Sequence, residues 1–193
     1  MKGKIDVFCK SIEPDDIAQG DLGDCWYLSA LSSLAERPYL VQRLFITQNY
    51  NDEGIYRLKL CKNGEWVEVT VDDYIPCYPH NGGPAFSKAH GNELWAMLLE
   101  KAYAKLHGCY TALRLGMPYD AYVDLTGCAT LSFNFEDVAE EIQSGAFFRK
   151  LVEYDRLQYL IAGCTKGVDN LTEGGKPGAK DGGIVPGHAY SII

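Results

Sequence analysis

Residues 19–26 read QGDLGDCW, and the residues around this stretch decide how it folds. The apolar residues that follow recur at intervals of three and four, the spacing of one face of an α-helix; they are Leu28, Leu31, Leu34 and Ala35. Pro38 then ends the pattern. The sequence therefore predicts a helix that begins at or next to Cys25, directly after a turn that contains two glycines.

The position of Cys25 at a helix start bears on its chemistry. The exposed N–H groups of the first helical turn carry partial positive charge, which favours a thiolate over a thiol. The local pattern has two interpretations, a buried structural cysteine or a nucleophile. Gly20 and Gly23 favour the nucleophile, because a cysteine that only fills a packing face does not require two glycines just before it.

The composition is that of an ordinary globular protein. The chain has 193 residues, enough for one large domain or two small ones, with 47% hydrophobic and 23% charged residues. Its 18 basic and 26 acidic residues give a net charge of −8, and no basic cluster stands out, which argues against nucleic-acid binding. No apolar run has the length of a transmembrane span, and the N-terminal residues lack the apolar core of a signal peptide. We therefore expect a soluble, cytoplasmic protein.

The cysteines predict neither disulfides nor a zinc site. Their number is odd and no C-x-x-C pair occurs. In a reducing compartment most of them would behave as small hydrophobic residues. Among the seven, only Cys25 has a context that calls for a chemical explanation.

The first two thirds of the chain predict helices and one hairpin. Residues 55–60 and 65–71 alternate in polarity on either side of an Asn-Gly turn, which is typical of a β-hairpin. A short helix is expected over residues 39–45. The strongest helical pattern covers residues 92–107, and Gly108 after it is the expected stop.

The pattern changes near residue 127. We expect the following elements in order: a strand over residues 128–135, a helix over 136–154 with a weak point at Ser144 and Gly145, an apolar strand over 157–164, a long loop over 165–184, and the beginning of a further apolar strand over 185–193.

A thiolate nucleophile needs a base and donors for the developing oxyanion. Histidine is the usual base near neutral pH. His188 follows a glycine and enters a predicted strand, from whose end it can point into a cleft. The other histidines are His80, His90 and His107. On spacing alone, His188 is as good a candidate for the base as these three combined. The backbone N–H of Cys25 and the side-chain amide of Gln19 can supply the oxyanion donors.

Residues 19–26 resemble the nucleophile segment of the calpains, the intracellular calcium-dependent cysteine proteases. Four further segments resemble the same family in the same order along the chain: residues 64–69 with 71–73, 92–95 with 98–105, 108–110 with 125–127, and 187–191. Five ordered motifs that span nearly the whole chain are far more specific than the papain-like Q-x5-C-W pattern alone.

The resemblance implies an α+β, papain-like fold of two lobes, in which a helical lobe with the cysteine faces a β-rich lobe with the histidine. Residues 1–127 would form a complete helical lobe. Residues 128–193 would form the start of the β-rich lobe, truncated at its C-terminal end. The cleft between such lobes would hold the active site.

The resemblance also implies an activity. The chain would belong to an endopeptidase that cleaves protein substrates through a thioester acyl-enzyme. Cys25 would be the nucleophile, His188 the base and Gln19 an oxyanion donor. Further domains or a regulatory subunit would lie outside this chain.

Calcium is the cofactor that the resemblance implies. The carboxylates of Asp16 and Glu93 would bind Ca²⁺ together with backbone carbonyls near Cys9 and Ser11, and oxygen ligands of this kind suit a hard cation. The alternative is that Glu93 only caps the helix that follows it and Asp16 only turns the chain.

One alternative function belongs to a different class. The orienting asparagine of the family follows the histidine, and this chain ends before it, so a catalytically impaired, calpain-like binding or scaffold module is the second interpretation. The presence of Gln19, Cys25 and His188 together favours the protease. Transglutaminase-type acyl transfer uses the same nucleophile chemistry but fits the surroundings of Cys25 less well.

Overall fold

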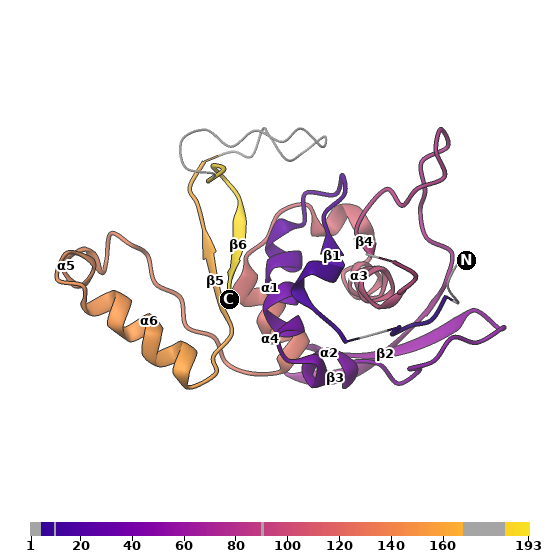
Figure 1. Cartoon of the computed structure of the whole chain (residues 1–193), viewed down its shortest axis with the longest axis horizontal. Coiled ribbons are helices and arrows are strands. Elements are labelled where there is room, and N and C mark those ends of the chain that lie inside the picture. Colours follow the sequence, from indigo (N-terminus) through magenta and orange to yellow (C-terminus); the bar gives the residue numbers. More distant parts are fainter. Residues whose placement is uncertain (1–4, 10, 90, 168–183) are drawn as a thin grey trace.

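The computed structural model describes residues 5–9, 11–89, 91–167 and 184–193. The fold is mixed α+β, with small two-stranded sheets set around helices (Figure 1). The helices are η1 (Pro14–Asp16), α1 (Cys25–Ala35), α2 (Pro38–Gln42), α3 (Trp95–Leu106), η2 (Tyr110–Leu113), α4 (Pro118–Thr126), α5 (Ala139–Gln143) and α6 (Ala146–Arg156). The strands are β1 (Ile17–Ala18), β2 (Ile55–Lys62), β3 (Glu65–Asp72), β4 (Lys88–Ala89), β5 (Ile161–Cys164) and β6 (Ala189–Ile192). Within these described ranges, no helix is both long enough and apolar enough to cross a membrane.

Helix α1 is the element on which the rest of the core packs. Every residue of α1 except Cys25 and Ser32 is buried. The Tyr27 ring stacks on Tyr103 of α3 with ring centroids 4.4 Å apart, and the Trp26 indole N–H donates to the carbonyl oxygen of Leu113 at 2.8 Å. A helix that is buried on nearly all sides is a core helix, and its ends lie where the surrounding elements hold them.

The β2–β3 hairpin forms one wall of this core. The two strands pair antiparallel from Ile55 opposite Asp72 to Lys62 opposite Glu65. Asn63 and Gly64 form the turn with φ of 52° and 82°, and this left-handed pair matches the right-handed twist of the strands. The alternating pattern of the sequence therefore correctly predicted a hairpin with one face buried against α3.

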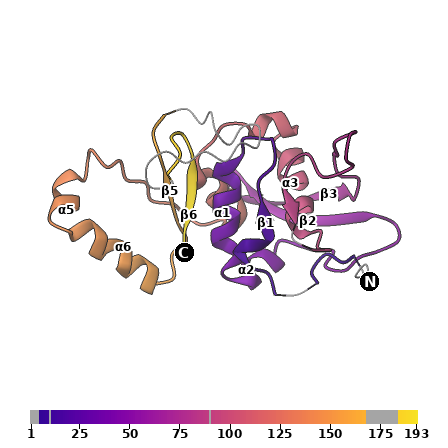
Figure 2. The same cartoon turned by 45° about the horizontal axis from the view of Figure 1, so that its top comes forward.

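A second sheet packs against the opposite side of α1. Strands β5 and β6 pair antiparallel, with Cys164 opposite Ala189. The Ser33 hydroxyl of α1 donates to the carbonyl oxygen of Ile161 at 3.1 Å, which ties this sheet to the helix. Helices α5 and α6 lie on the far side of the β5–β6 sheet from α1 (Figures 1 and 2).

Two expectations for the second part of the chain need correction. Residues 128–134 form no strand, because Phe133 and Phe135 both pack against Phe147 of α6, at ring-centroid distances of 5.6 and 6.0 Å, instead of alternating across a sheet. The single helix expected over 136–154 is two helices, α5 and α6, which are separated at the predicted weak point, where Gly145 has a φ of 72°. Most of the loop expected over 165–184 lies outside the described residues.

A buried carboxylate joins α3, α4 and the hairpin. Asp124 of α4 is 5% exposed and its Oδ2 accepts hydrogen bonds from Lys62 Nζ at 3.0 Å and from Tyr103 Oη at 3.1 Å. His107 Nε2 lies 3.1 Å from the same oxygen. Burial alone would raise the pKa of Asp124, but the hydrogen bonds from His107, Lys62 and Tyr103 outweigh it and hold the pKa below its ordinary value.

We expect Asp124→Ala to lower the free energy of unfolding at pH 7 by about 3 kcal/mol, because it leaves the buried donors around it without an acceptor. Urea denaturation followed by fluorescence measures this change. Glu68→Ala is the matched control, since it removes an exposed carboxylate that lies 3.6 Å from Arg57, and it should cost under about 1 kcal/mol. Equal losses in the two variants would contradict the role of Asp124 in joining these elements.

Candidate active site

Cys25 is the first residue of α1, and the backbone before it presents the thiol at the helix start. Gly23 has a φ of 69°, a left-handed conformation that favours glycine. The carbonyl oxygen of Asp24 accepts the N–H groups of Tyr27 at 2.9 Å and Leu28 at 3.0 Å, which begins the helix. Cys25 is half-buried, so its sulfur is both close to the positive end of α1 and accessible.

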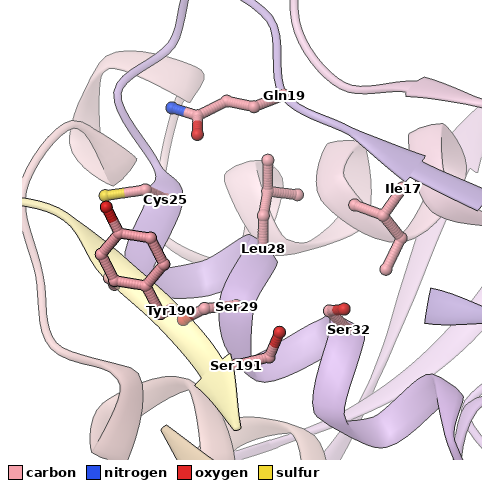
Figure 3. Close-up of a pocket in the computed structure, with 9 residues that line it drawn as sticks. Ile17, Gln19, Cys25, Leu28, Ser29, Ser32, Tyr190 and Ser191 are labelled. Atoms are coloured by element: carbon pink, nitrogen blue, oxygen red, sulfur yellow. The ribbon is translucent and has the colours of Figure 1, made fainter. Parts of the chain in front are cut away.

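The thiol faces a pocket of about 210 Å³ (Figure 3). One side comes from the segment before α1 and from α1 itself, and the other side comes from β6. The lining residues are Ile17, Gln19, Cys25, Leu28, Ser29, Ser32, Ala189, Tyr190 and Ser191. The two residues of α1 that are not buried, Cys25 and Ser32, both line it. The structure thus brings two of the predicted site residues, Cys25 and Gln19, to one pocket.

The loop that carries Gln19 is held by close backbone packing. A Cβ atom on Gly20 would lie 2.1 Å from the carbonyl oxygen of Phe86 and 2.6 Å from that of Ala85. The N–H of Asp21 donates to the same Ala85 oxygen at 3.0 Å. Glycine is therefore required at position 20 for space, and this contact sets where the Gln19 amide lies.

The structure places His188 next to the pocket but does not place it among the lining residues. Its N–H donates to the Thr165 hydroxyl at 3.0 Å, and its carbonyl oxygen accepts the N–H of Thr165 at 2.9 Å. Its ring packs edge-on against the Tyr190 ring with centroids 4.9 Å apart. The backbone of His188 is thus fixed at the start of β6, one residue before Ala189, which does line the pocket.

Two residues near the thiol were not predicted. Tyr190 lines the pocket and points its hydroxyl toward Cys25 (Figure 3), and that hydroxyl accepts the N–H of Val185 at 2.7 Å. Strand alternation gives no signal for it, because the consecutive residues Ala189, Tyr190 and Ser191 all line the pocket. The pKa of Cys164 is raised by burial and, to a smaller extent, by the nearby Cys25 thiol, so a second sulfur lies close to that thiol.

The residues expected to bind calcium form two local groups. The N-terminal segment pairs with the residues before α3, where Glu93 Oε1 accepts the N–H of Cys9 at 3.1 Å and Glu93 Oε2 accepts the Trp95 indole N–H at 3.0 Å. In the other group, Asp16 Oδ2 accepts the N–H of Glu13 at 2.8 Å, and the Ser11 hydroxyl donates to Glu13. Asp16 therefore does turn the chain, since its carboxylate accepts the N–H of the residue that precedes η1.

The chemistry of these donors fits a hard cation. Glu93 is only 5% exposed, and its carboxylate accepts hydrogen bonds from the backbone N–H of Cys9 and from the Trp95 indole; carboxylate oxygens are ligands that suit Ca²⁺. In the part of the chain that the structure describes, no three His, Cys, Asp or Glu side chains cluster closely enough to hold a metal ion. A site here would accordingly depend on two carboxylates and on backbone carbonyl oxygens.

A cysteine at a helix start with a glutamine in the same pocket is an arrangement that a cysteine protease can use for a nucleophile and an oxyanion donor. The model of the calpain family of cysteine proteases matches residues 1–193. The calpain-type cysteine protease DEK1 of Zea mays is 44% identical over 97% of this chain, and Calpain-A of Drosophila melanogaster is 35% identical over 92%. Calpain-5 of Mus musculus is 34% identical over 96%. The chain belongs to the calpain family. It spans 8%, 20% and 30% of the lengths of these three relatives.

We expect Gly20→Ala to lower the free energy of unfolding by about 2 kcal/mol, because the new Cβ forces the Gln19 loop away from residues 85 and 86. Urea denaturation measures the change. Gly83→Ala is the control, since its Cβ would meet only the Asn81 side chain, at 3.4 Å. Similar stability of the two variants would show that the Gly20 contact does not hold the loop.

Proposed function

We propose that this chain is the protease part of a calcium-dependent, intracellular calpain-type endopeptidase that acts on protein substrates. The observation that carries the proposal is the shared pocket, in which Cys25 begins α1 and Gln19 lies beside it. The ordered calpain motifs and the family match support it. The scaffold alternative has no observation of its own in its favour.

The proposed reaction begins at the thiolate of Cys25. The sulfur attacks the carbonyl carbon of a peptide bond, and the carbonyl oxygen becomes an oxyanion. The backbone N–H of Cys25 and the Gln19 side-chain amide donate hydrogen bonds to this oxygen, each typically worth about 3 kcal/mol of transition-state stabilisation. The leaving amine takes a proton, a thioester remains on Cys25, and water then hydrolyses it.

His188 is the proposed base and acid of this cycle. It would take the thiol proton, give it to the leaving amine, and later take a proton from the attacking water. The Thr165 contacts fix its backbone at the start of β6, next to Ala189, which lines the pocket together with Cys25. A calcium-driven rotation of the two lobes, as the calpain resemblance implies, would switch such a site between two states.

Asp16 and Glu93 are the proposed calcium ligands, with backbone carbonyls near Cys9 and Ser11. Bound calcium would supply positive charge that links two carboxylates. Asp16 ends η1 and lies three residues before Gln19, whereas Glu93 lies just before α3. A link between them would therefore connect the segment that leads into the pocket to the helix that packs against α1.

Calcium should raise the thermal midpoint of unfolding. At a calcium concentration about a hundred times the dissociation constant we expect a rise of about 5 to 10 °C, because the ion binds the folded state only. The double variant Asp16→Ala with Glu93→Ala should abolish this rise in differential scanning fluorimetry. Asp52→Ala with Glu53→Ala, which removes two exposed carboxylates, is the control and should leave it unchanged. A full calcium shift in the first variant would remove the site from Asp16 and Glu93.

An epoxide-type cysteine probe tests the nucleophile. We expect selective labelling of Cys25, faster with calcium than without it, because the start of α1 favours the thiolate and the assembled site orients it. Peptide mapping by mass spectrometry locates the adduct, with the exposed Cys128 as the internal reference. Slow and equal labelling of several cysteines, unaffected by calcium, would instead support the scaffold alternative.

A further inference from the structure

Two carboxyl groups, those of Asp24 and Glu100, are buried near the start of α1, where Cys25 lies. Glu100 lies in the middle of α3 and is 2% exposed. Its two carboxyl oxygens accept the N–H of Ser87, at 3.0 and 3.2 Å. Its carboxyl interacts with that of Asp24, which is 0% exposed and immediately precedes Cys25. Two acidic side chains thus share one buried space under the start of α1.

The hydrogen bonding of Asp24 is incomplete if both carboxyls are charged. Both of its oxygens are fully buried, and no N–H or hydroxyl group of any other described residue hydrogen-bonds to them; apart from Glu100, only its own backbone N–H interacts with the carboxyl. An ionised carboxylate without a donor, next to a second carboxylate, is one of the costliest arrangements in a protein interior. A proton between the two carboxyls removes one charge and supplies the missing donor.

We propose that Glu100 holds a proton that it donates to Asp24, and that this carboxylic acid–carboxylate pair positions both Cys25 and the Gln19 loop. The positioning half of this proposal rests on the proposed function, in which Cys25 is the nucleophile. The protonation half does not.

The environment of the two groups determines which of them carries the proton. Burial, followed by the repulsion from Asp24, raises the pKa of Glu100 to about 9. Burial raises the pKa of Asp24 only to about 6, because the hydrogen bond from Glu100 favours its charged form. Tyr27 of α1 and Tyr110 of η2 also interact with Glu100, and burial raises the pKa of both hydroxyls, so they stay neutral. Glu100 is therefore the acid and Asp24 the carboxylate at neutral pH.

Glu100 acts on the pocket indirectly, through its contacts with Asp24 and with Ser87. Through Asp24 it holds the residue whose carbonyl oxygen accepts the first N–H groups of α1. Through the N–H of Ser87 it holds the segment whose neighbouring residues, 85 and 86, pack on Gly20 and so place Gln19. One buried acid thus supports the nucleophile and the oxyanion donor together.

Glu100→Gln tests the protonation. Between the ordinary pKa of 4.5 and about 9, the folded chain would hold a proton on Glu100 that the unfolded chain has released. Stability should therefore fall as pH rises, and this group contributes up to a tenfold increase in the unfolding equilibrium constant per pH unit. In Glu100→Gln the amide supplies the donor at every pH. We expect the ratio of the wild-type unfolding constant to that of the variant to grow by roughly tenfold per pH unit from about pH 6.5 to 8.5. A pH-independent difference would overturn the protonation.

The rate of alkylation of Cys25 by iodoacetamide, relative to that of Cys128 in the same molecule, tests the positioning. Glu100→Gln should keep this ratio within about twofold of wild type at pH 7. Glu100→Ala should lower it about tenfold, because the start of α1 then loses the buried group that positions it, and the thiol pKa rises by about one unit as the sulfur leaves the positive end of the helix. The pH profile of the ratio should shift to higher pH by the same amount.

Leu58→Ala is the control for general destabilisation, since Leu58 is fully buried in β2 and does not line the pocket. An equal loss in the control and Glu100→Ala, with no shift in the pH profile, would reduce Glu100 to a structural residue. If Glu100→Ala does not fold, the Glu100→Gln comparison still decides the protonation. A wild-type Cys25 that reacts no faster than Cys128 would refute the proposed function and leave the stability test of Glu100 intact.

Discussion

The structure depends on one constraint: α1 has to be buried on nearly all sides and still present the Cys25 thiol to a pocket at its first residue. Burial of nearly all of the helix fixes its axis, since α3, α4 and the β5–β6 sheet all contact it. Its N-terminus is therefore as rigid as the core itself. The partial positive charge of the exposed N–H groups then acts on a sulfur whose position varies little. A nucleophile on a core helix is held by the whole fold, whereas one on a surface loop is not.

The segments that complete the pocket are held by backbone contacts. The Gln19 loop rests on residues 85 and 86 because position 20 has no side chain. The start of β6 is fixed by hydrogen bonds between His188 and Thr165. Buried carboxylates support these contacts: Asp124 of α4 accepts a hydrogen bond from Tyr103 of α3, and Glu100 of α3 accepts the N–H of Ser87, next to residues 85 and 86. The site is thus assembled from sequence-distant pieces that meet around α1 and α3.

The helix at Cys25, the hairpin and α3 could be predicted from the sequence because each has a strong local signal: three-and-four spacing, alternation around an Asn-Gly turn, and a glycine stop. The region after residue 127 could be predicted less well. Phe133 and Phe135 alternate as in a strand, but their partner is a helix, and a local pattern does not reveal the partner.

Some residues of the site could likewise be predicted from a local sequence signal, whereas others could not. Cys25 and Gln19 lie six positions apart, so their proximity followed from a short loop. The Glu100 carboxyl could not be found from the sequence, because on the pattern of α3 it reads as an ordinary solvent-facing charge. Tyr190 could not be found from alternation along β6, because three consecutive residues of that strand line the pocket. The calcium ligands remain a prediction, since among the described residues no three His, Cys, Asp or Glu side chains gather around Asp16 or Glu93.

The central claim is that Cys25 forms a covalent acyl intermediate. Mixing the protein with a short peptide ester in calcium, quenching in acid and measuring intact and peptide-mapped masses tests it most directly. The account predicts a gain equal to the acyl group of the ester, located on Cys25 and released by hydroxylamine, as expected for a thioester. Hydrolysis of the ester with the acyl group on another residue, or an acyl adduct that persists in Cys25→Ser, would contradict it.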